Sequence, residues 1–264
     1  MKVHPTAIIH ENASLGSGVS VGPYCVVGPG VEIGADCELI SHVVLDGPSR
    51  VGEKNRFFPY ASVGLEPQDL KYKGEITRLE IGDHNIIREF VTVHRGTEQG
   101  GGVTRIGNHN LLMAYCHVAH DCQLADHIVM ANGAALGGHV TIEDYAVLGA
   151  YCGIHQFSRI GRHSFIGAYT PVNRDVVPFS MTTADRKAEI YGVNAVGLDR
   201  RDFSKKQIQA LRGAFRILKQ PGLNTSQAVD AIKEQIQQAD QADDQEVLKK
   251  LVEFIWTAKK GIVK

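Results

Sequence analysis

The residues best suited to acid–base chemistry are four histidines in the short segments CHVAHDC, GGHV and IHQF. They are His117, His120, His139 and His155. Imidazole exchanges protons near neutral pH, so a histidine beside a substrate can act as a general acid or base. Four further histidines are scattered and are expected on the surface, namely His4, His10, His42 and His84.

Two residues could complete a catalytic group around His120. The carboxylate of Asp121 could accept an N–H from the His120 imidazole and raise its basicity. This pairing requires a corner of the backbone, because adjacent side chains of a flat strand point to opposite faces. Gly138 follows in the segment GGHV, and its N–H could approach a developing oxyanion. The pattern predicts an acid–base site, with a histidine-bound metal ion as the alternative.

The elements that must position these residues follow from a repeat of six. A large apolar residue recurs every sixth position in three runs, from Ile9 to Val63, from Ile81 to Val93 and from Ile106 to Val172. Of these 25 positions, 23 are Ile, Leu or Val and 12 are followed by glycine, which suits a tight turn. A period of six fits neither an α-helix nor simple strand alternation. It indicates a short strand and a turn, repeated, and we call this unit a hexad.

Three hexads close a triangular coil of about 18 residues, and successive coils stack as parallel strands about 4.8 Å apart. The predicted fold class is an all-β left-handed parallel β-helix. Residues one coil apart then lie above one another, so His120, Gly138 and Gln156 form a column, and the other three histidines lie within about 10 Å of it. One inward slot of the hexad holds all the cysteines, which are therefore predicted to be free and buried: Cys25, Cys37, Cys116, Cys122 and Cys152.

Two segments lose the repeat, residues 65–80 and residues 94–105. Both are predicted to be loops extruded from the β-helix, which should cover residues 1–188. The spacing of Val63 and Ile81 equals three hexads, which predicts that they belong to one coil in register. Loops on a rigid scaffold often carry functional residues.

A small α-helical C-terminal domain is predicted over residues 189–264. Ser204 and Gln207 have the spacing of a capping box, and an apolar helical face follows them. Two more helices are expected at about residues 225–239 and 243–260.

Composition excludes several classes of protein. The chain has 264 residues, 43% of them hydrophobic, and a net charge of −1, so no global field favours nucleic acid or an anionic membrane. No apolar run is long enough to span a membrane. We therefore expect a cytoplasmic protein with no nucleic-acid partner and no integral membrane contact. From Lys187 onward there are 14 Lys and Arg against 10 Asp and Glu, which could favour an acidic partner or phosphates.

Six segments together carry a resemblance to a known family: QDLKYKGE, HRGTEQGGG, NLLMAYCHVAHDC, GGHVTIED, IHQF and GVNAVGLDRRDFS. The chain resembles the UDP-N-acetylglucosamine O-acyltransferases, hexapeptide-repeat enzymes of lipid A biosynthesis, over essentially its whole length. The resemblance implies a homotrimer with active sites in clefts between adjacent coils. It implies transfer of an (R)-3-hydroxyacyl group from acyl carrier protein to the glucosamine 3-OH of UDP-N-acetylglucosamine, without a cofactor or metal ion.

The resemblance also implies roles for single residues. His120 matches the general base, Asp121 its orienting partner, and Gly138 the amide that holds the oxyanion. Ala168 matches the acyl-chain ruler, where a methyl group in place of glycine implies a somewhat shorter chain. The positions that match substrate contacts are Asp69, Lys71, His117, His139, His155, Gln156, Asn194, Arg200 and Arg201.

Three other functions remain open from the residues alone. A related acyltransferase could use another acceptor, such as a 3-amino sugar or the substrate of the N-acyltransferase. A metal-dependent hydratase of the carbonic anhydrase type would hold zinc at His117 or His139. A non-catalytic solenoid binder would have no need of the histidine column.

Overall fold

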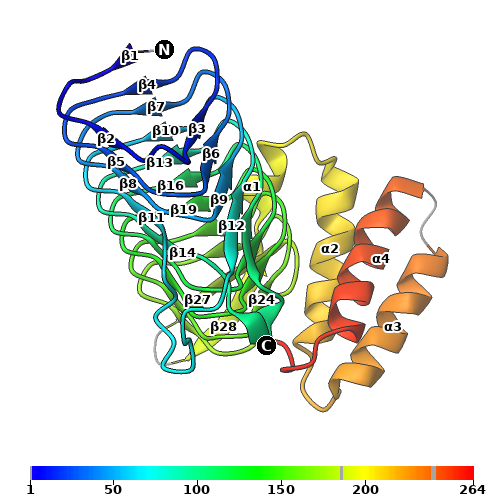
Figure 1. Cartoon of the computed structure of the whole chain (residues 1–264). Helices are drawn as coiled ribbons and strands as arrows, with labels where there is room; N and C mark the ends of the chain where they lie inside the picture. The colour runs from blue at the N-terminus through cyan, green and yellow to red at the C-terminus, as the bar shows by residue number, and fades with distance from the viewer. Residues whose placement is uncertain (1, 185–186, 239–241) are drawn as a thin grey trace.

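The chain forms a three-sided prism of stacked coils with a group of helices beside it (Figure 1). A computed structural model describes residues 2–184, 187–238 and 242–264. Three sheets make the sides of the prism, and we name them A, B and C in the order in which each coil enters them, with 11, 9 and 8 strands. The left-handed parallel β-helix predicted from the hexads is confirmed.

Most strands are very short, because each hexad spends its other residues on the turn to the next side. Sheet A contains β1 (Lys2–Val3), β4 (Ser20–Val21), β7 (Glu38–Leu39), β10 (Arg56–Phe57), β13 (Ile86–Ile87), β16 (Leu111–Leu112), β19 (Val129–Met130), β22 (Val147–Leu148), β25 (Phe165–Ile166), β27 (Ser180–Ala184) and β28 (Ala188–Val193). Sheet B contains β2 (Ile8–Ile9), β5 (Val26–Val27), β8 (Val44–Leu45), β11 (Ser62–Leu65), β14 (Thr92–His94), β17 (His117–Val118), β20 (Ala135–Leu136), β23 (Gly153–Ile154) and β26 (Pro171–Val172). Sheet C contains β3 (Ser14–Leu15), β6 (Val31–Ile33), β9 (Ser49–Val51), β12 (Arg78–Ile81), β15 (Val103–Ile106), β18 (Gln123–Leu124), β21 (Thr141–Ile142) and β24 (Arg159–Ile160).

The register follows the predicted coil except at the two loops. His117 pairs with Ala135, three hexads later, as most strand residues do. Val63 pairs with Val93, five hexads later instead of three, so the first loop adds the length of two hexads to its coil. The prediction that Val63 and Ile81 lie one coil apart in register is therefore wrong. They lie on neighbouring sides of the prism, on sheets B and C, which are normally one hexad apart in the chain. The loop between them adds the length of two hexads, so their spacing equals three hexads by coincidence.

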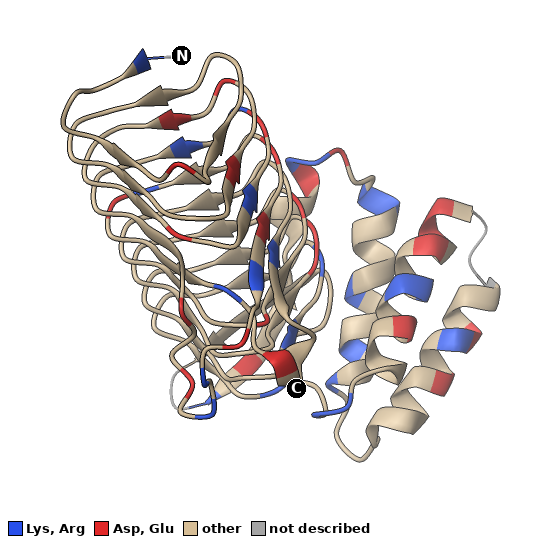
Figure 2. Ribbon diagram, in the orientation of Figure 1, with Lys and Arg blue, Asp and Glu red and all other residues tan. Residues whose placement is uncertain are grey.

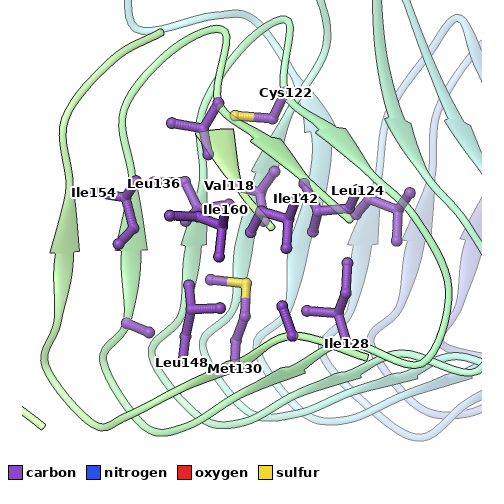
Figure 3. Close-up of a cluster of buried hydrophobic side chains, with 14 of the residues drawn as sticks. Val118, Cys122, Leu124, Ile128, Met130, Leu136, Ile142, Leu148, Ile154 and Ile160 are labelled. Carbon is purple, nitrogen blue, oxygen red and sulfur yellow. The ribbon is translucent and has the colours of Figure 1, made fainter. Parts of the chain in front are cut away.

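The large apolar residue of each hexad points into the prism and packs against those of the coils above and below (Figure 3). Leu136, Ile142 and Leu148 are almost fully buried, and each such side chain stabilises the fold by roughly 1.5–3 kcal/mol. All five cysteines are free and buried, as predicted. Burial raises the pKa of Cys122 and of Cys152 to about 12, so neither thiol is ionised near neutral pH.

Each coil turns three corners, and the corner residue often has a positive φ although it is not glycine. Long columns of rings cover this backbone at two of the corners, whereas the third has one stacked pair, His139 and Phe157, with centroids 4.3 Å apart. Between sheets A and B the rings, tilted at first and then stacked, run Tyr24, His42, Tyr60, Phe90 and Tyr115. Between sheets C and A they run His84, His109, His127, Tyr145 and His163. We call these the A–B and C–A corners, and the third the B–C corner.

The C-terminal helices are α1 (Ala195–Asp199), α2 (Lys205–Leu218), α3 (Thr225–Gln238) and α4 (Ala242–Trp256). The capping box at Ser204 and Gln207 is present, with hydrogen bonds of 3.1 and 2.8 Å. The last helix ends at Trp256 and so stops short of the predicted residue 260. Sheet A continues through β28 to Val193, beyond the boundary expected at residue 188. Among the residues described, no helix is long and apolar enough to cross a membrane.

Candidate active site

His120 and Asp121 occupy the B–C corner. Asp121 has a φ of 62°, and this left-handed corner allows two adjacent side chains to meet. Nδ1 of His120 lies 2.8 Å from Oδ2 of Asp121. The contact predicted from sequence is present, and the required corner is present too.

Hydrogen bonds from the second loop (residues 95–102) fix the Asp121 carboxylate. Its side chain is fully buried, and it accepts the N–H of Thr97 at 2.9 Å and the hydroxyl of Thr97 at 2.6 Å. Gly100 packs so closely over this carboxylate that a side chain there would collide with it. An acceptor held in this way requires His120 to donate through Nδ1, which leaves Nε2 as the free base.

Gly138 lies against the His120 ring from the next coil. A Cβ added to Gly138 would sit 2.6 Å from Cε1 of His120, so only glycine allows the ring to lie here. The Gly138 N–H has no hydrogen-bond acceptor among the residues that the structure describes. An unpaired N–H next to a base is suited to stabilise negative charge.

A cavity of about 820 Å³ opens in front of His120. Its walls come from the prism and from both loops: Gln68, Asp69, Leu70, Lys71, Thr97, Gln99, Gly100, His120, His139, Gln156 and Phe157. The first loop (residues 66–77) leaves the prism after β11 and reaches Gln156 and Phe157, four coil steps further along, a distance of about 19 Å. The sequence-predicted residues Asp69, Lys71 and Gln156 therefore meet His120 in one cavity.

Burial keeps the histidines around His120 neutral. His139 lies edge-on to His120 at 5.2 Å and 3.7 Å from Asp121, and desolvation lowers its pKa. His117 contacts the Thr92 hydroxyl at 2.7 Å, and burial lowers its pKa as well. Burial, helped by His117 and His120, lowers the pKa of His94 to about 4. His94 was missed from the sequence, although it ends the repeat at the HRGT segment.

The same group has the donor atoms of a metal site. Ligand atoms of His120, Asp121 and His139 all lie within 4.8 Å of one another. Two imidazoles and a carboxylate suit zinc or another divalent transition metal. In the present geometry, however, the Nδ1 of His120 is engaged by Asp121.

Six of the residues predicted from sequence to contact or measure the substrate do not line this cavity, and His117, which contacts Thr92, is one of them. His155 faces a neighbouring groove, where Lys260 approaches its Nδ1 at 3.0 Å. Asn194 caps α1 and donates to the His163 carbonyl at 2.9 Å. The other three lie elsewhere: Arg201 stacks on Tyr145 at 4.6 Å, Arg200 is exposed at the end of α1, and Ala168 is exposed at the A–B corner.

Comparisons with known proteins match this architecture. A family described as bacterial transferase hexapeptide matches residues 12–47, and one described as UDP N-acetylglucosamine O-acyltransferase, domain 2, matches residues 175–263. A protein of Thermodesulfovibrio yellowstonii, named "Acyl-[acyl-carrier-protein]--UDP-N-acetylglucosamine O-acyltransferase", is 44% identical over 261 residues, which cover 99% of this chain and 98% of that protein. The chain belongs to the UDP-N-acetylglucosamine O-acyltransferase family. The resemblance predicted from the six segments is therefore confirmed, and the protein is an acyltransferase.

Solved structures of this family share both parts of the molecule. The structure of LpxA from Acinetobacter baumannii is 44% identical and superimposes with a TM-score of 0.93 over 99% of each chain. The UDP-N-acetylglucosamine O-acyltransferase from Moraxella catarrhalis is 40% identical, with a TM-score of 0.94 over the whole of both chains. Since one family match covers residues 175–263, the C-terminal helices belong to the family's architecture along with the repeats.

Proposed function

We propose that the protein transfers an (R)-3-hydroxyacyl group from acyl carrier protein to the glucosamine 3-OH of UDP-N-acetylglucosamine, the first step of lipid A synthesis. The observation that carries the proposal is the His120–Asp121 pair, which leaves Nε2 of His120 free beside a cavity of about 820 Å³. A sugar hydroxyl is a poor nucleophile, so the reaction needs a positioned base of this kind.

In the proposed reaction, Nε2 of His120 takes the proton of the sugar 3-OH as its oxygen attacks the thioester carbonyl. The buried Asp121 carboxylate stabilises the imidazolium that forms. The N–H of Gly138 stabilises the oxyanion of the tetrahedral intermediate. When this intermediate collapses, the C–S bond breaks, and the thiolate of the carrier leaves and takes the proton from His120.

The transfer is direct, without an acyl-enzyme. All the cysteines are buried, and burial raises the pKa of Cys116 to about 11 and that of Cys122 to about 12. A buried, protonated thiol is a poor nucleophile. Asp69 and Lys71 line the same cavity as His120 and are proposed to bind the sugar nucleotide, together with Gln156 and the neutral His139.

We also propose a homotrimer, because the three sides of the prism differ in character. Sheet C has an outer row of charges that alternate in sign, Glu32, Arg50, Glu80 and Arg105, as a solvated face would (Figure 2). The outer row of sheet A begins with polar and charged residues, but from β13 to β25 it is apolar and partly exposed: Ile86, Leu111, Val129, Val147 and Phe165. Such a row usually marks an interface. In a closed trimer, Asn194, Arg200, Arg201 and Ala168 of one copy would complete the cavity of the next.

The deciding experiment offers the purified protein (R)-3-hydroxyacyl carrier proteins of graded chain length, each with UDP-N-acetylglucosamine or its 3-amino analogue. Mass spectrometry should show one acylated sugar nucleotide, formed equally well with a metal chelator present. No product from any pair, or product only with added metal, would reject the proposed function. Light scattering should give about 86 kDa, three times the 28.8 kDa chain.

A further inference from the structure

Arg95, the first residue of the second loop, is a buried cation that contacts the first loop. Its side chain is only 9% exposed. Nη1 donates to the carbonyl of Gly64 at 3.0 Å, and Nη2 donates to the hydroxyl of Tyr72 at 3.0 Å. The backbone N–H of Arg95 donates to the carbonyl of Leu65 at 3.1 Å. One residue thus binds both the end of β11, from which the first loop leaves, and the middle of that loop.

Two carboxylates, one on the prism and one in the first loop, lie near the positive charge of Arg95. Asp46 on the prism lies 3.8 Å from Nη1, and Glu66 in the first loop lies 3.7 Å from Nη2. The guanidinium also lies 5.7 Å from the centre of the Tyr72 ring. A buried guanidinium with two carboxylates, two carbonyls and an aromatic ring around it is confined to one position, because leaving it would strand a buried charge.

Tyr72, which Arg95 contacts, is hydrogen-bonded within the loop to the residues that line the cavity. The N–H of Tyr72 donates to the carbonyl of Asp69 at 3.0 Å, and the Asp69 carboxylate accepts the N–H of Lys71 at 3.0 Å. Asp69, Lys71 and Tyr72 therefore form one turn. The loop has little apolar packing of its own, since Leu70 is fully exposed and Ile76 is 93% exposed. Its placement depends on polar contacts such as those of Arg95.

We propose that Arg95 is a positioning residue for substrate binding, which holds the first loop so that Asp69 and Lys71 line the same cavity as His120. Arg95 does not line the cavity itself. Its role rests on the proposed function, because Asp69 and Lys71 bind the sugar nucleotide only if that function is right. The anchoring of the loop is a separate physical claim.

The kinetic test compares Arg95→Met with Arg105→Met. Arg105 lies on the outer face of β15, 47% exposed, and its side chain pairs with Glu80 on the neighbouring strand β12. Arg95→Met should raise KM for UDP-N-acetylglucosamine at least about tenfold and keep kcat within about threefold, because the lost interactions act on binding. Arg105→Met should change neither constant. A fall in kcat at unchanged KM would overturn the proposal.

Hydrogen exchange of the substrate-free proteins tests the anchoring without reference to activity. Amides 66–77 should exchange at least about tenfold faster in Arg95→Met than in Arg105→Met, with the prism unchanged. Tyr72→Phe, which removes only the hydroxyl that Arg95 contacts, should show a smaller change of the same kind in exchange and in KM. If Arg95→Met does not fold, the Tyr72→Phe variant alone tests whether the contact with Arg95 anchors the first loop. Unchanged loop exchange in a folded variant overturns the proposal, whereas faster exchange without acyl transfer overturns only the proposed function.

Discussion

The B–C corner at His120 and the C–A corner at His127 have nearly the same backbone but different surroundings. Asp121 has a φ of 62° and His127 a φ of 58°, and both corners carry histidines on successive coils. At the C–A corner, His127 stacks face to face between His109 and Tyr145, with centroids 4.9 and 4.6 Å away. At the B–C corner, two loops cover the histidines and bury the carboxylate beside His120.

This difference shows that the hexad alone does not make the site. The repeat places a residue at the same corner once in every coil. Where no loop covers the corner, the rings of these residues stack on one another. The first insertion lengthens its coil by two hexads and the second by slightly more than one, and both fold over the B–C corner. They provide Thr97 for Asp121 and bring Asp69 and Lys71 into the cavity that His120 lines. The loops therefore give the histidine at the B–C corner a fixed carboxylate partner and a cavity, which the stacked histidines of the C–A corner lack.

The largest effect should separate the two corners directly. His120→Ala should lower kcat by about 10³-fold or more, because it removes the base. His127→Ala should leave kcat within about threefold, since His127 only stacks. Steady-state acyl-transfer rates check this, with circular dichroism to confirm folding. Equal losses in both variants would mean that His120 acts through stability and not through chemistry.

A second effect concerns the space that the base needs. Gly138→Ala should lower kcat by about 10²-fold, because its Cβ would lie 2.6 Å from the His120 ring and displace it. Gly153→Ala, one coil later on sheet B, is the matched control, since no heavy atom lies within 4 Å of its added Cβ. Rates of the two variants give the comparison. Full activity in Gly138→Ala would show that the observed position of the His120 ring is not needed.

Two buried histidines, one in each region, should both make the folded protein less stable as the pH falls. Burial lowers the pKa of His94, at the end of β14, and of His163, at the C–A corner, to about 4 from an ordinary 6.5. The unfolded chain therefore binds protons between pH 6.5 and pH 4 that the folded chain does not. The stability from these histidines is complete above pH 6.5 and is lost as the pH falls towards 4. Urea unfolding should show His94→Gln losing roughly 2–3 kcal/mol less than the parent over this window. An unchanged slope would argue against a buried, neutral His94.

The sequence was sufficient for the parts of the molecule that repeat. A single apolar residue every six positions gives the coil length, and the coil length brings His120 against Gly138. The capping box at Ser204 is local and was equally predictable. The spacing of Val63 and Ile81 misled because an insertion as long as two hexads keeps the phase of the repeat.

The loop contacts were out of reach for a different reason. Thr97 and Arg95 meet residues 24 and 23 positions away, Asp121 and Tyr72, through a path that no period describes. Likewise, nothing in the segment VNAVGLDRR indicates which corner it reaches. Arg201 lies against Tyr145 only because β28 reverses direction and the chain then crosses to the C–A corner.

The smallest expected effect comes from the second loop. It shows whether the Thr97 hydroxyl assists His120 through Asp121, or whether the loop only covers the site. Thr97→Val keeps the side-chain shape and the N–H that donates to Asp121 at 2.9 Å, but it removes the hydroxyl that donates at 2.6 Å. Asp121 then keeps its place with one donor fewer, so kcat should fall by about 5–10-fold with KM nearly unchanged. Thr97→Ser retains the hydroxyl and should keep most of the rate. If both variants match the parent, the Thr97 hydroxyl has no part in catalysis, and the Thr97 N–H and His120 suffice to hold the Asp121 carboxylate.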